Sequence, residues 1–427
     1  MYPASEFEMS LDVFQQVFSL SLASNLVNFD NGTQACLQKA LQLRLGIALK
    51  GVPGWQVVWG PVVRKKKPED DTTGPGNSWY VAFHPNLKFE DGSVHPTYVI
   101  AIAGTPEESK DVWFNQTFAV DSVTDFNAWV AGGIEALPVV VRPPSIKPGT
   151  PYIATGIVNP VHALLTIPAP EGAACPGKTL LDFITDVDAS GGNKFITTGH
   201  SLGGALSSTL TLALVSAGVI PANTTLTYPT AGPSPGNKGF TDLFAVTFPP
   251  RKSDSAKSYQ GWNLNLVNTL DIISQAWSVQ RKVSPEQNLY NIPPIYGKPV
   301  LPLVRGLTLV AIVHSLRSGV LYFPLPSQYF SGDPPPSPPT SSKEFLQIFG
   351  LQHQQVYFDE VGVQFLEVDV PVPCPGLTPK TEDERWFNYP LITWFQWARE
   401  HPEDAEKAIK EAEGTDEAKD FLTEASN

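Results

Sequence analysis

Cysteine is scarce in this chain of 427 residues, which contains only Cys36, Cys175 and Cys374. Three cysteines allow one disulfide bridge at most, so the fold cannot depend on a disulfide framework. None of them has a histidine or a second cysteine at metal-ligand spacing, and we therefore expect no metal site. Two of the three stand in Cys-Pro-Gly, a sequence that is typical of turns.

Positive charge is also scarce, with 29 lysines and arginines against 42 acidic residues and a formal net charge of −13. A nucleic-acid partner would require a basic patch, so we expect none. The one compact charge run, at 65–71, is interpreted as a solvated surface loop.

Long hydrophobic runs are missing. No uncharged apolar run approaches the roughly 18 residues that a membrane-spanning helix needs, so no transmembrane segment is expected. The N-terminus has no basic segment followed by an apolar run, and no signal peptide is visible. These observations fit either a cytosolic protein or a mature or engineered form of a secreted one.

What the sequence does contain is a regular alternation of strand and helix patterns. Leucine and phenylalanine recur at four-residue spacing between 11 and 49, which predicts N-terminal helices covering a sheet edge. The alternation predicts an α/β fold with a mostly parallel central sheet and helices on both faces. Strands are expected at 55–59, 78–83, 97–103, 194–198, 224–230 and 264–268, with helices beginning at 179 and covering 205–217 and 307–316.

One Gly-x-Ser-x-Gly sequence, with Ser201 at its centre, stands between a predicted strand and a predicted helix. A sharp turn from strand to helix exposes a serine hydroxyl, and Gly199 and Gly203 remove the Cβ atoms that would clash there. The turn also aims free helix N–H groups, including that of Leu202, at a developing oxyanion. We interpret Ser201 as a nucleophile; the alternative is a structural turn with an inert serine.

A serine nucleophile needs a base that is held by an acid. In α/β-hydrolase sheets the chain order is the serine, then the acid, then the histidine base. Asp271 comes a short turn after the strand that ends at Asn268, where such sheets place catalytic groups. His353 is the favoured base. The rival acids are Asp242 and Asp254, both in surface-type segments, and the rival bases are His314, in an apolar helical run, and His401, at the start of a charged helix.

Two further segments invite a functional interpretation. The aromatic stretch at 110–118, with Trp113, Phe114 and Phe118, is either an ordinary core helix or a mobile lid over an apolar cleft. We divide the chain into one domain over 1–400, with an insertion around 280–345, and a charged amphipathic helix over 401–427. That helix is interpreted as a packed tail, with a partner-binding helix as the alternative.

Five motifs in order resemble those of the class 3 lipases, the fungal-type triacylglycerol lipase family with the α/β-hydrolase fold. The resemblance covers roughly residues 75 to 360. The sequence departs from the family pattern at Ala103, where an arginine is usual, and after Asp271, where a proline is missing. The motifs are Ala103-Gly104-Thr105, Thr198 to Ala205 around the serine, Gly232-Pro233 to Phe240, Asn268-Thr269-Leu270-Asp271, and His353 with Tyr357.

The resemblance implies a carboxyl-ester hydrolase that acts on acylglycerol-type lipid esters, possesses a lid at 111–118 and is secreted, while a cytoplasmic location stays open. It implies that Thr105 and Leu202 supply the oxyanion hole. No metal or organic cofactor and no obligate protein partner are expected. The alternatives are a phospholipase A1 or a short-chain or aryl esterase on the same triad, and a non-catalytic binding protein that keeps the fold.

Overall fold

The computed structural model describes residues 11–106, 119–187, 192–253 and 256–364, together with Val368, Cys374, 377–379, Glu403, Lys407 and Lys410. The expected lid residues Trp113, Phe114 and Phe118 and nearly all of the C-terminal helix lie outside this set. None of the helices within it is long and apolar enough to cross a membrane.

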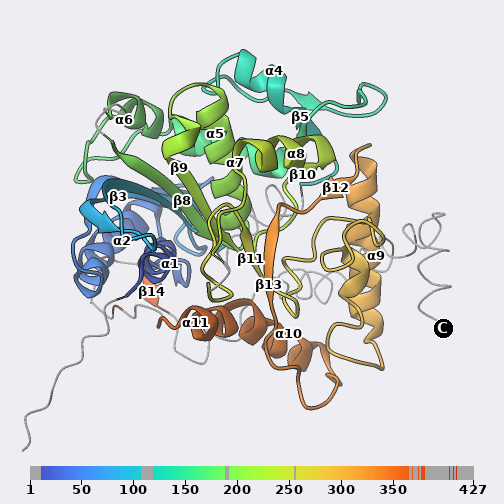
Figure 1. Cartoon of the computed structure of the whole chain (residues 1–427). Coiled ribbons are helices and arrows are strands. Elements are labelled where there is room, and N and C mark those ends of the chain that lie inside the picture. Colours follow the sequence, from blue (N-terminus) through green and yellow to red (C-terminus); the bar gives the residue numbers. More distant parts are fainter. Residues whose placement is uncertain are drawn as a thin grey trace, which may run out of the picture.

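A seven-stranded sheet runs through the middle of the described chain (Figure 1). The five strands from β13 to β4 are parallel, and β3 and β2 complete one side with antiparallel pairing. The predicted mostly parallel α/β fold is therefore confirmed. In spatial order the strands are β13 (Ser327–Phe330), β11 (Asn265–Asn268), β9 (Thr225–Thr230), β8 (Lys194–His200), β4 (Val94–Ile102), β3 (Asn77–Lys88) and β2 (Gln56–Arg64).

Both faces of this sheet are buried, because successive side chains of its central strands enter different cores. Ile100 and Ile102 of β4 belong to the core on one face, and Val99 and Ala101 to the core on the other. The first face is covered by α5 (Thr155–Thr166), α6 (Leu180–Asp186) and α7 (Leu202–Ser216), and the second by α1 (Val13–Ala23), α2 (Gln34–Ala48) and α11 (Val356–Val361) (Figure 1). The predicted N-terminal helices are thus confirmed, but α1 packs on the central strands β8 and β4 and not on a sheet edge as expected.

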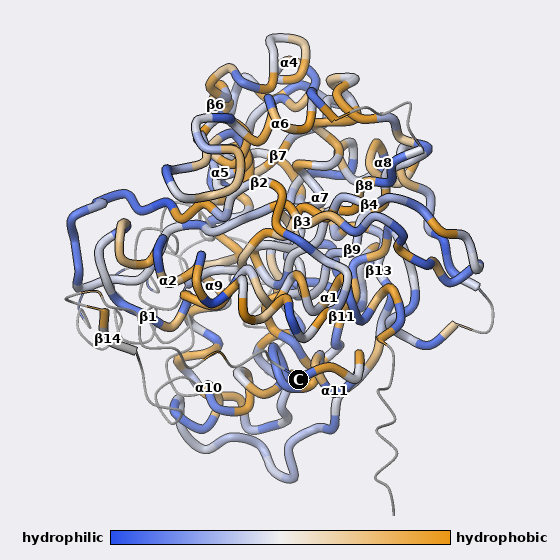
Figure 2. The backbone as a smooth tube through the Cα atoms, turned by 90° about the vertical axis from the view of Figure 1, so that its left-hand side faces the viewer, coloured by the Kyte–Doolittle hydropathy of each residue, from blue (hydrophilic) through white to orange (hydrophobic). Residues whose placement is uncertain are grey.

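A second, five-stranded sheet of very short antiparallel strands was not expected from the sequence. The helices α4 (Phe126–Ala131) and α8 (Lys238–Thr247) lie next to it. The turned view places α4 to α6 at one end of the molecule, with α10 and α11 at the other (Figure 2). Its strands, in order, are β12 (Tyr322–Phe323), β10 (Gly236–Asn237), β7 (Tyr152–Ala154), β5 (Val123–Asp125) and β6 (Val140–Val141).

The segment at 280–345 supplies several elements beside the loop that follows β11. It contains α9 (Pro302–Arg317) and β13 and reaches into α10 (Ser342–Gly350), so the predicted helix at 307–316 is confirmed. A third, smaller core joins Ile272, next to Asp271, to Leu307 of α9 and to Phe349 of α10. The segment therefore packs directly against the chain around Asp271.

The expected solvated charge loop is wrong at Lys65, whose surface is only 6% exposed. Its ammonium group donates to the backbone carbonyls of Gly32, Asp70 and Thr73 at 2.8, 2.6 and 2.7 Å. Three acceptors compensate for the loss of water, which is the condition for burying such a group. Burial lowers the pKa of Lys65, while Asp70 and Asp71 oppose that shift.

The N-terminal helices are also tied to a late part of the chain. Cys36 of α2 forms a disulfide with Cys374, and β1 (Asp30–Asn31) pairs antiparallel with β14 (Thr378–Pro379). Cys175 is a free thiol. The remaining short helices are η1 (Leu49–Gly51), η4 (Ala222–Thr224), η5 (Leu289–Asn291) and η6 (Leu351–Gln355), the last being a π-helix.

Candidate active site

Ser201 lies in a strained turn between β8 and α7. Its backbone has φ 62° and ψ −129°, a conformation that residues other than glycine rarely adopt. The turn is held by the Ser201 N–H, which donates to the Thr230 carbonyl of β9 at 2.9 Å, and by the Gly204 N–H, which donates to the Ser201 carbonyl at 2.9 Å. Strain maintained by the surrounding structure is common at functional sites.

The two glycines of the motif are required by their neighbours. A Cβ atom on Gly199 would overlap the backbone of Gly203, and one on Gly203 would overlap the carbonyl of Ile102 on β4. The close approach of α7 to β8 and β4 therefore depends on the missing side chains, as the sequence predicted.

Asp271 and His353 meet in a buried pair. The Asp271 Oδ2 atom lies 2.8 Å from His353 Nδ1, and the two side chains are 0% and 2% exposed. Because a carboxylate only accepts, His353 donates from Nδ1, and Nε2 is the ring nitrogen that can act as a base. The other carboxylate oxygen, Oδ1, accepts the N–H of Ile273 at 2.9 Å.

Tyr357 completes the surroundings of the carboxylate. Its hydroxyl donates to Asp271 Oδ2 at 3.0 Å and accepts the N–H of Asn268 at 2.9 Å. Burial first, and the nearby Asp271 charge second, raise the pKa of Tyr357 well above its ordinary value, so the phenol stays protonated. The Asn268 amide in turn donates to the carbonyl of Gln352, which precedes His353, at 2.8 Å.

His200 connects this pair to the serine turn. Its Nε2–H donates to the carbonyl of His353 at 2.7 Å, and its Nδ1 accepts the Thr230 hydroxyl at 2.9 Å. The His200 and His353 ring centroids are 4.8 Å apart. Burial, and then the proximity of His353, lower the pKa of His200 well below its ordinary value. The neutral ring thus joins the residue before Ser201 to the backbone of His353.

The expected oxyanion residues lie on either side of the serine. Leu202 is the first residue of α7, so its N–H belongs to the first turn, which has no acceptor within the helix. Thr105 follows Gly104 beyond the end of β4, and a Cβ atom on Gly104 would lie 3.2 Å from the Ser201 Cβ. The structure thus brings Ser201, Leu202 and the Gly104-Thr105 peptide together.

The rival residues do not join this cluster. Asp242 forms an exposed ion pair with Lys238 on α8 at 2.6 Å. His314 is half-buried on α9, where burial, and then Arg317, lower its pKa. Asp254 and His401 lie outside the described residues.

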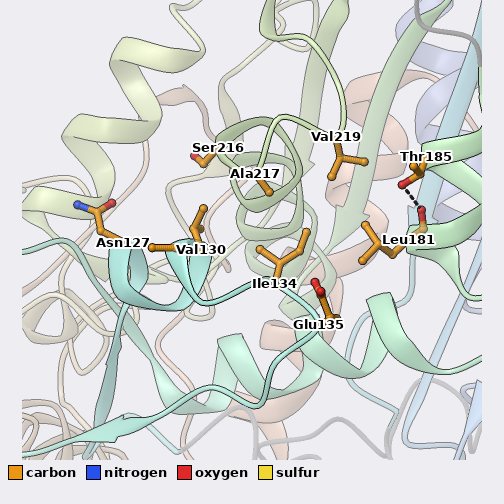
Figure 3. A pocket seen from close by; sticks show the side chains of 11 residues that line it. Asn127, Val130, Ile134, Glu135, Leu181, Thr185, Ser216, Ala217 and Val219 are labelled. Atoms are coloured by element: carbon orange, nitrogen blue, oxygen red, sulfur yellow. Dashed lines mark hydrogen bonds between the residues drawn. The ribbon is translucent and has the colours of Figure 1, made fainter.

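Two pockets lie on the described part of the molecule, one at the far end of α7 and one against α10. The larger, of about 670 Å³, is lined by Val130, Glu135, Leu181 and Val219, at the end of α7 opposite to Ser201 (Figure 3). The smaller, of about 420 Å³, lies between the prolines at 335–336 and α10, and its lining includes Ile348 and Leu351. Leu351 is the first residue of η6, the helix that also contains His353. Groups of three or more potential metal ligands do not occur among the described residues.

Sequence reasoning missed two kinds of contact at this site. His200 precedes Ser201 in the Gly-x-Ser-x-Gly sequence, and its link to His353 could not be inferred from that place. Asn25 and Asn28 lie just beyond α1 and bind the backbone of Gly104. No spacing in the sequence marks these two asparagines, because their partner is more than seventy residues away.

The parallel sheet, the strained serine turn and the buried Asp–His pair define an α/β-hydrolase. Residues 145–279, about a third of the chain, match the family model described as Lipase (class 3). Over these residues the chain is similar to the class 3 lipases, and this match together with the site indicates a serine ester hydrolase.

A solved lipase structure shares this fold. A structure of M37 lipase is 23% identical with a TM-score of 0.59, and the match covers 82% of this chain and 92% of that one. A lipase from Rhizopus microsporus var. chinensis is 14% identical with a TM-score of 0.37, and the match covers 61% of this chain and 69% of that one. The LIP2 lipase of Yarrowia lipolytica is 15% identical with a TM-score of 0.37, and the match covers 61% of this chain and 73% of that one. No curated protein matches the sequence.

Proposed function

We propose that the protein hydrolyses acylglycerol-type lipid esters through a triad of Ser201, His353 and Asp271. The observation that carries this proposal is the buried hydrogen bond between Asp271 and His353, joined through His200 to the serine turn. A base held by a carboxylate, together with a serine at a strand-to-helix turn, is the arrangement that acyl transfer requires.

The chemistry follows from this arrangement. Ser201 Oγ attacks the ester carbonyl carbon while His353 Nε2 takes the hydroxyl proton. The C–O bond to the alcohol then breaks, and His353 returns the proton to the leaving oxygen. Water, activated by the same Nε2, attacks the acyl-enzyme and releases the fatty acid. Asp271 holds the tautomer of His353 and stabilises the imidazolium throughout.

The negative charge that forms on the carbonyl oxygen needs donors that are already in place. We assign this role to the backbone N–H groups of Leu202 and Thr105. A preorganised donor of this kind contributes about 3–4 kcal/mol to stabilising the transition state. The segment at 111–118 is proposed as the lid, by resemblance to the family.

A lipid substrate is supported by the family resemblance and by exposed apolar side chains on the segment that carries the base. Leu351, two residues before His353, is 52% exposed, and with Ile348 it lines the smaller pocket. Exposed aliphatic side chains of this kind fit an acyl chain better than a polar substrate. A phospholipase A1 and a short-chain or aryl esterase would use the same triad and are separated from a lipase by the experiment below.

We also propose that the protein is secreted. Disulfides persist mainly in oxidising compartments, and Cys36 and Cys374 form one here. Counting free thiols in protein purified from its native source tests this point: one thiol supports it, and three contradict it.

The test of the activity compares wild type with Ser201→Ala on p-nitrophenyl esters of increasing chain length, below and above the point where the substrate aggregates. Ser208→Ala, another buried serine of α7, is the matched control. We expect wild type and the control to hydrolyse long-chain esters, and Ser201→Ala to lose at least a thousandfold in kcat.

An alkyl phosphonate should label wild type at Ser201 and leave Ser201→Ala unlabelled. Activity confined to short soluble esters would support the esterase alternative, and a preference for phospholipids the phospholipase alternative. Equal activity of Ser201→Ala and wild type would contradict the triad.

A further inference from the structure

Two asparagines at the end of α1 hold both polar groups of a single backbone residue, Gly104. Asn25 Oδ1 accepts the Gly104 N–H at 2.9 Å, and Asn28 Nδ2 donates to the Gly104 carbonyl at 3.3 Å. Gly104 precedes Thr105, and its Cα lies against the serine turn. An N-terminal helix that lies outside the family match at 145–279 therefore contacts the candidate oxyanion loop.

The orientation of both amide groups is fixed by their other partners. Asn25 Nδ2 donates to the carbonyl of Ser21 at 2.9 Å and to the hydroxyl of Ser24 at 3.3 Å, so its oxygen must face Gly104. Asn28 Nδ2 also donates to Asn25 Oδ1 at 2.8 Å. With both of its N–H groups in use, the Asn28 amide cannot turn without losing two hydrogen bonds.

The planarity of the peptide bond gives this contact a consequence for catalysis. The Gly104 carbonyl and the Thr105 N–H belong to one planar trans unit and point in opposite directions. A donor that fixes the carbonyl therefore fixes the direction of the N–H. Asn28 thus acts on the Thr105 N–H without touching it, and Asn25 fixes the preceding peptide in the same way.

We propose that Asn25 and Asn28 are positioning residues that hold the Gly104–Thr105 peptide so that the Thr105 N–H faces the oxyanion. The inference rests on the proposed function, because it assumes that Thr105 supplies one of the two oxyanion donors. Gly104 has no side chain that could anchor it, and a Cβ atom there would lie 2.9 Å from the His200 carbonyl. Support for this loop comes from α1.

The discriminating variant is Asn28→Asp. A carboxylate cannot donate to the Gly104 carbonyl or to Asn25, and it places a negative charge near the oxyanion. We expect kcat on a soluble p-nitrophenyl ester to fall ten- to a hundredfold with KM within twofold of wild type. Affinity for an alkyl boronic acid, which forms a tetrahedral adduct with the serine, should fall by a similar factor.

Asn263→Asp is the matched control. Asn263 is 1% exposed and also binds backbone on both sides, accepting the Thr227 N–H at 3.0 Å and donating to the Pro249 carbonyl at 2.9 Å. It lies near the start of β9, away from Ser201. A loss of stability similar to that of Asn28→Asp, with unchanged kcat, separates positioning from folding. If Asn28→Asp does not fold, the neutral Asn28→Ser replaces it, with the same expectation.

Four results overturn the proposal. Wild-type kcat in a folded Asn28 variant does so, and so does an equal loss of kcat in both asparagine variants. A rise in KM with unchanged kcat would instead assign Asn28 to substrate binding. A wild type that neither hydrolyses esters nor reacts with the phosphonate would overturn the proposed function itself, and this inference with it.

Discussion

Among single residues, Tyr357 holds the carboxylate of the candidate site by a hydrogen bond. Its hydroxyl is shared between the Asp271 carboxylate and the Asn268 N–H, all of them buried. Asp271 thus accepts hydrogen bonds from a phenol, an imidazole and a backbone N–H. These three donors replace the water that a buried carboxylate has lost. The orientation of His353 depends on a carboxylate that cannot rotate.

Tyr357→Phe removes this hydroxyl and keeps the ring. The buried Asn268 N–H loses its partner, so we expect the free energy of unfolding to fall by about 1–3 kcal/mol. Asp271 loses one donor, and we expect kcat to fall by about tenfold. Urea unfolding and ester hydrolysis measure the two effects.

Tyr329→Phe is the control for that change. Tyr329 is 41% exposed on β13, and its hydroxyl donates to Gln287 at 3.0 Å. A change below about 0.5 kcal/mol is expected there. If both tyrosine variants match wild type in stability and kcat, the hydroxyl of Tyr357 has no supporting role.

For the secondary-structure elements, sequence patterns sufficed wherever the pattern was long and local. The strand, turn and helix around Ser201 were predicted because apolar periodicity and the two glycines lie within one short stretch. Asp271 and His353 were selected by chain order and by resemblance, and the structure brings them within 2.8 Å. Their meeting depends on tertiary packing, which no local pattern describes.

The missed elements are those whose cause is not local. Strands β5, β6 and β10 have two or three residues, too few to show an alternation of apolar and polar side chains. Lys65 resembles any surface lysine in the sequence, because no local pattern shows that its ammonium group donates to the carbonyls of Gly32, Asp70 and Thr73. Asn25 is equally inconspicuous, because its partner Gly104 belongs to another element.

The effect of replacing a glycine on stability also differs from one element to another. Gly46 lies in the exposed part of α2 with no atom near its missing side chain, so Gly46→Ala should stabilise the protein by about 0.5–1 kcal/mol. Gly199→Ala forces overlap with Gly203, and we expect a loss of about 3 kcal/mol together with slower phosphonate labelling. Denaturant unfolding of the two variants provides the comparison; the same sign for both would refute it.

On the scale of the whole molecule, the disulfide between Cys36 and Cys374 spans 338 residues of sequence. A cross-link over so long a loop restricts the unfolded chain, and its removal from a native protein typically costs about 2–5 kcal/mol. We therefore expect Cys36→Ser to lower the free energy of unfolding by that amount. Cys175→Ser, at the free thiol, should stay within about 1 kcal/mol of wild type. Equal stabilities of the two variants would show that the bridge is absent or without effect.

The same bridge determines what a protease could separate. The largely exposed proline-rich loop at 333–339 lies between Asp271 and His353 along the chain. A single cut there would leave Ser201 and Asp271 on one fragment and His353 on the other. Because the first fragment carries Cys36 and the second Cys374, the pieces stay covalently joined. Such a clipped enzyme would keep its three candidate catalytic residues in one particle, and two bands would separate on a gel only after reduction.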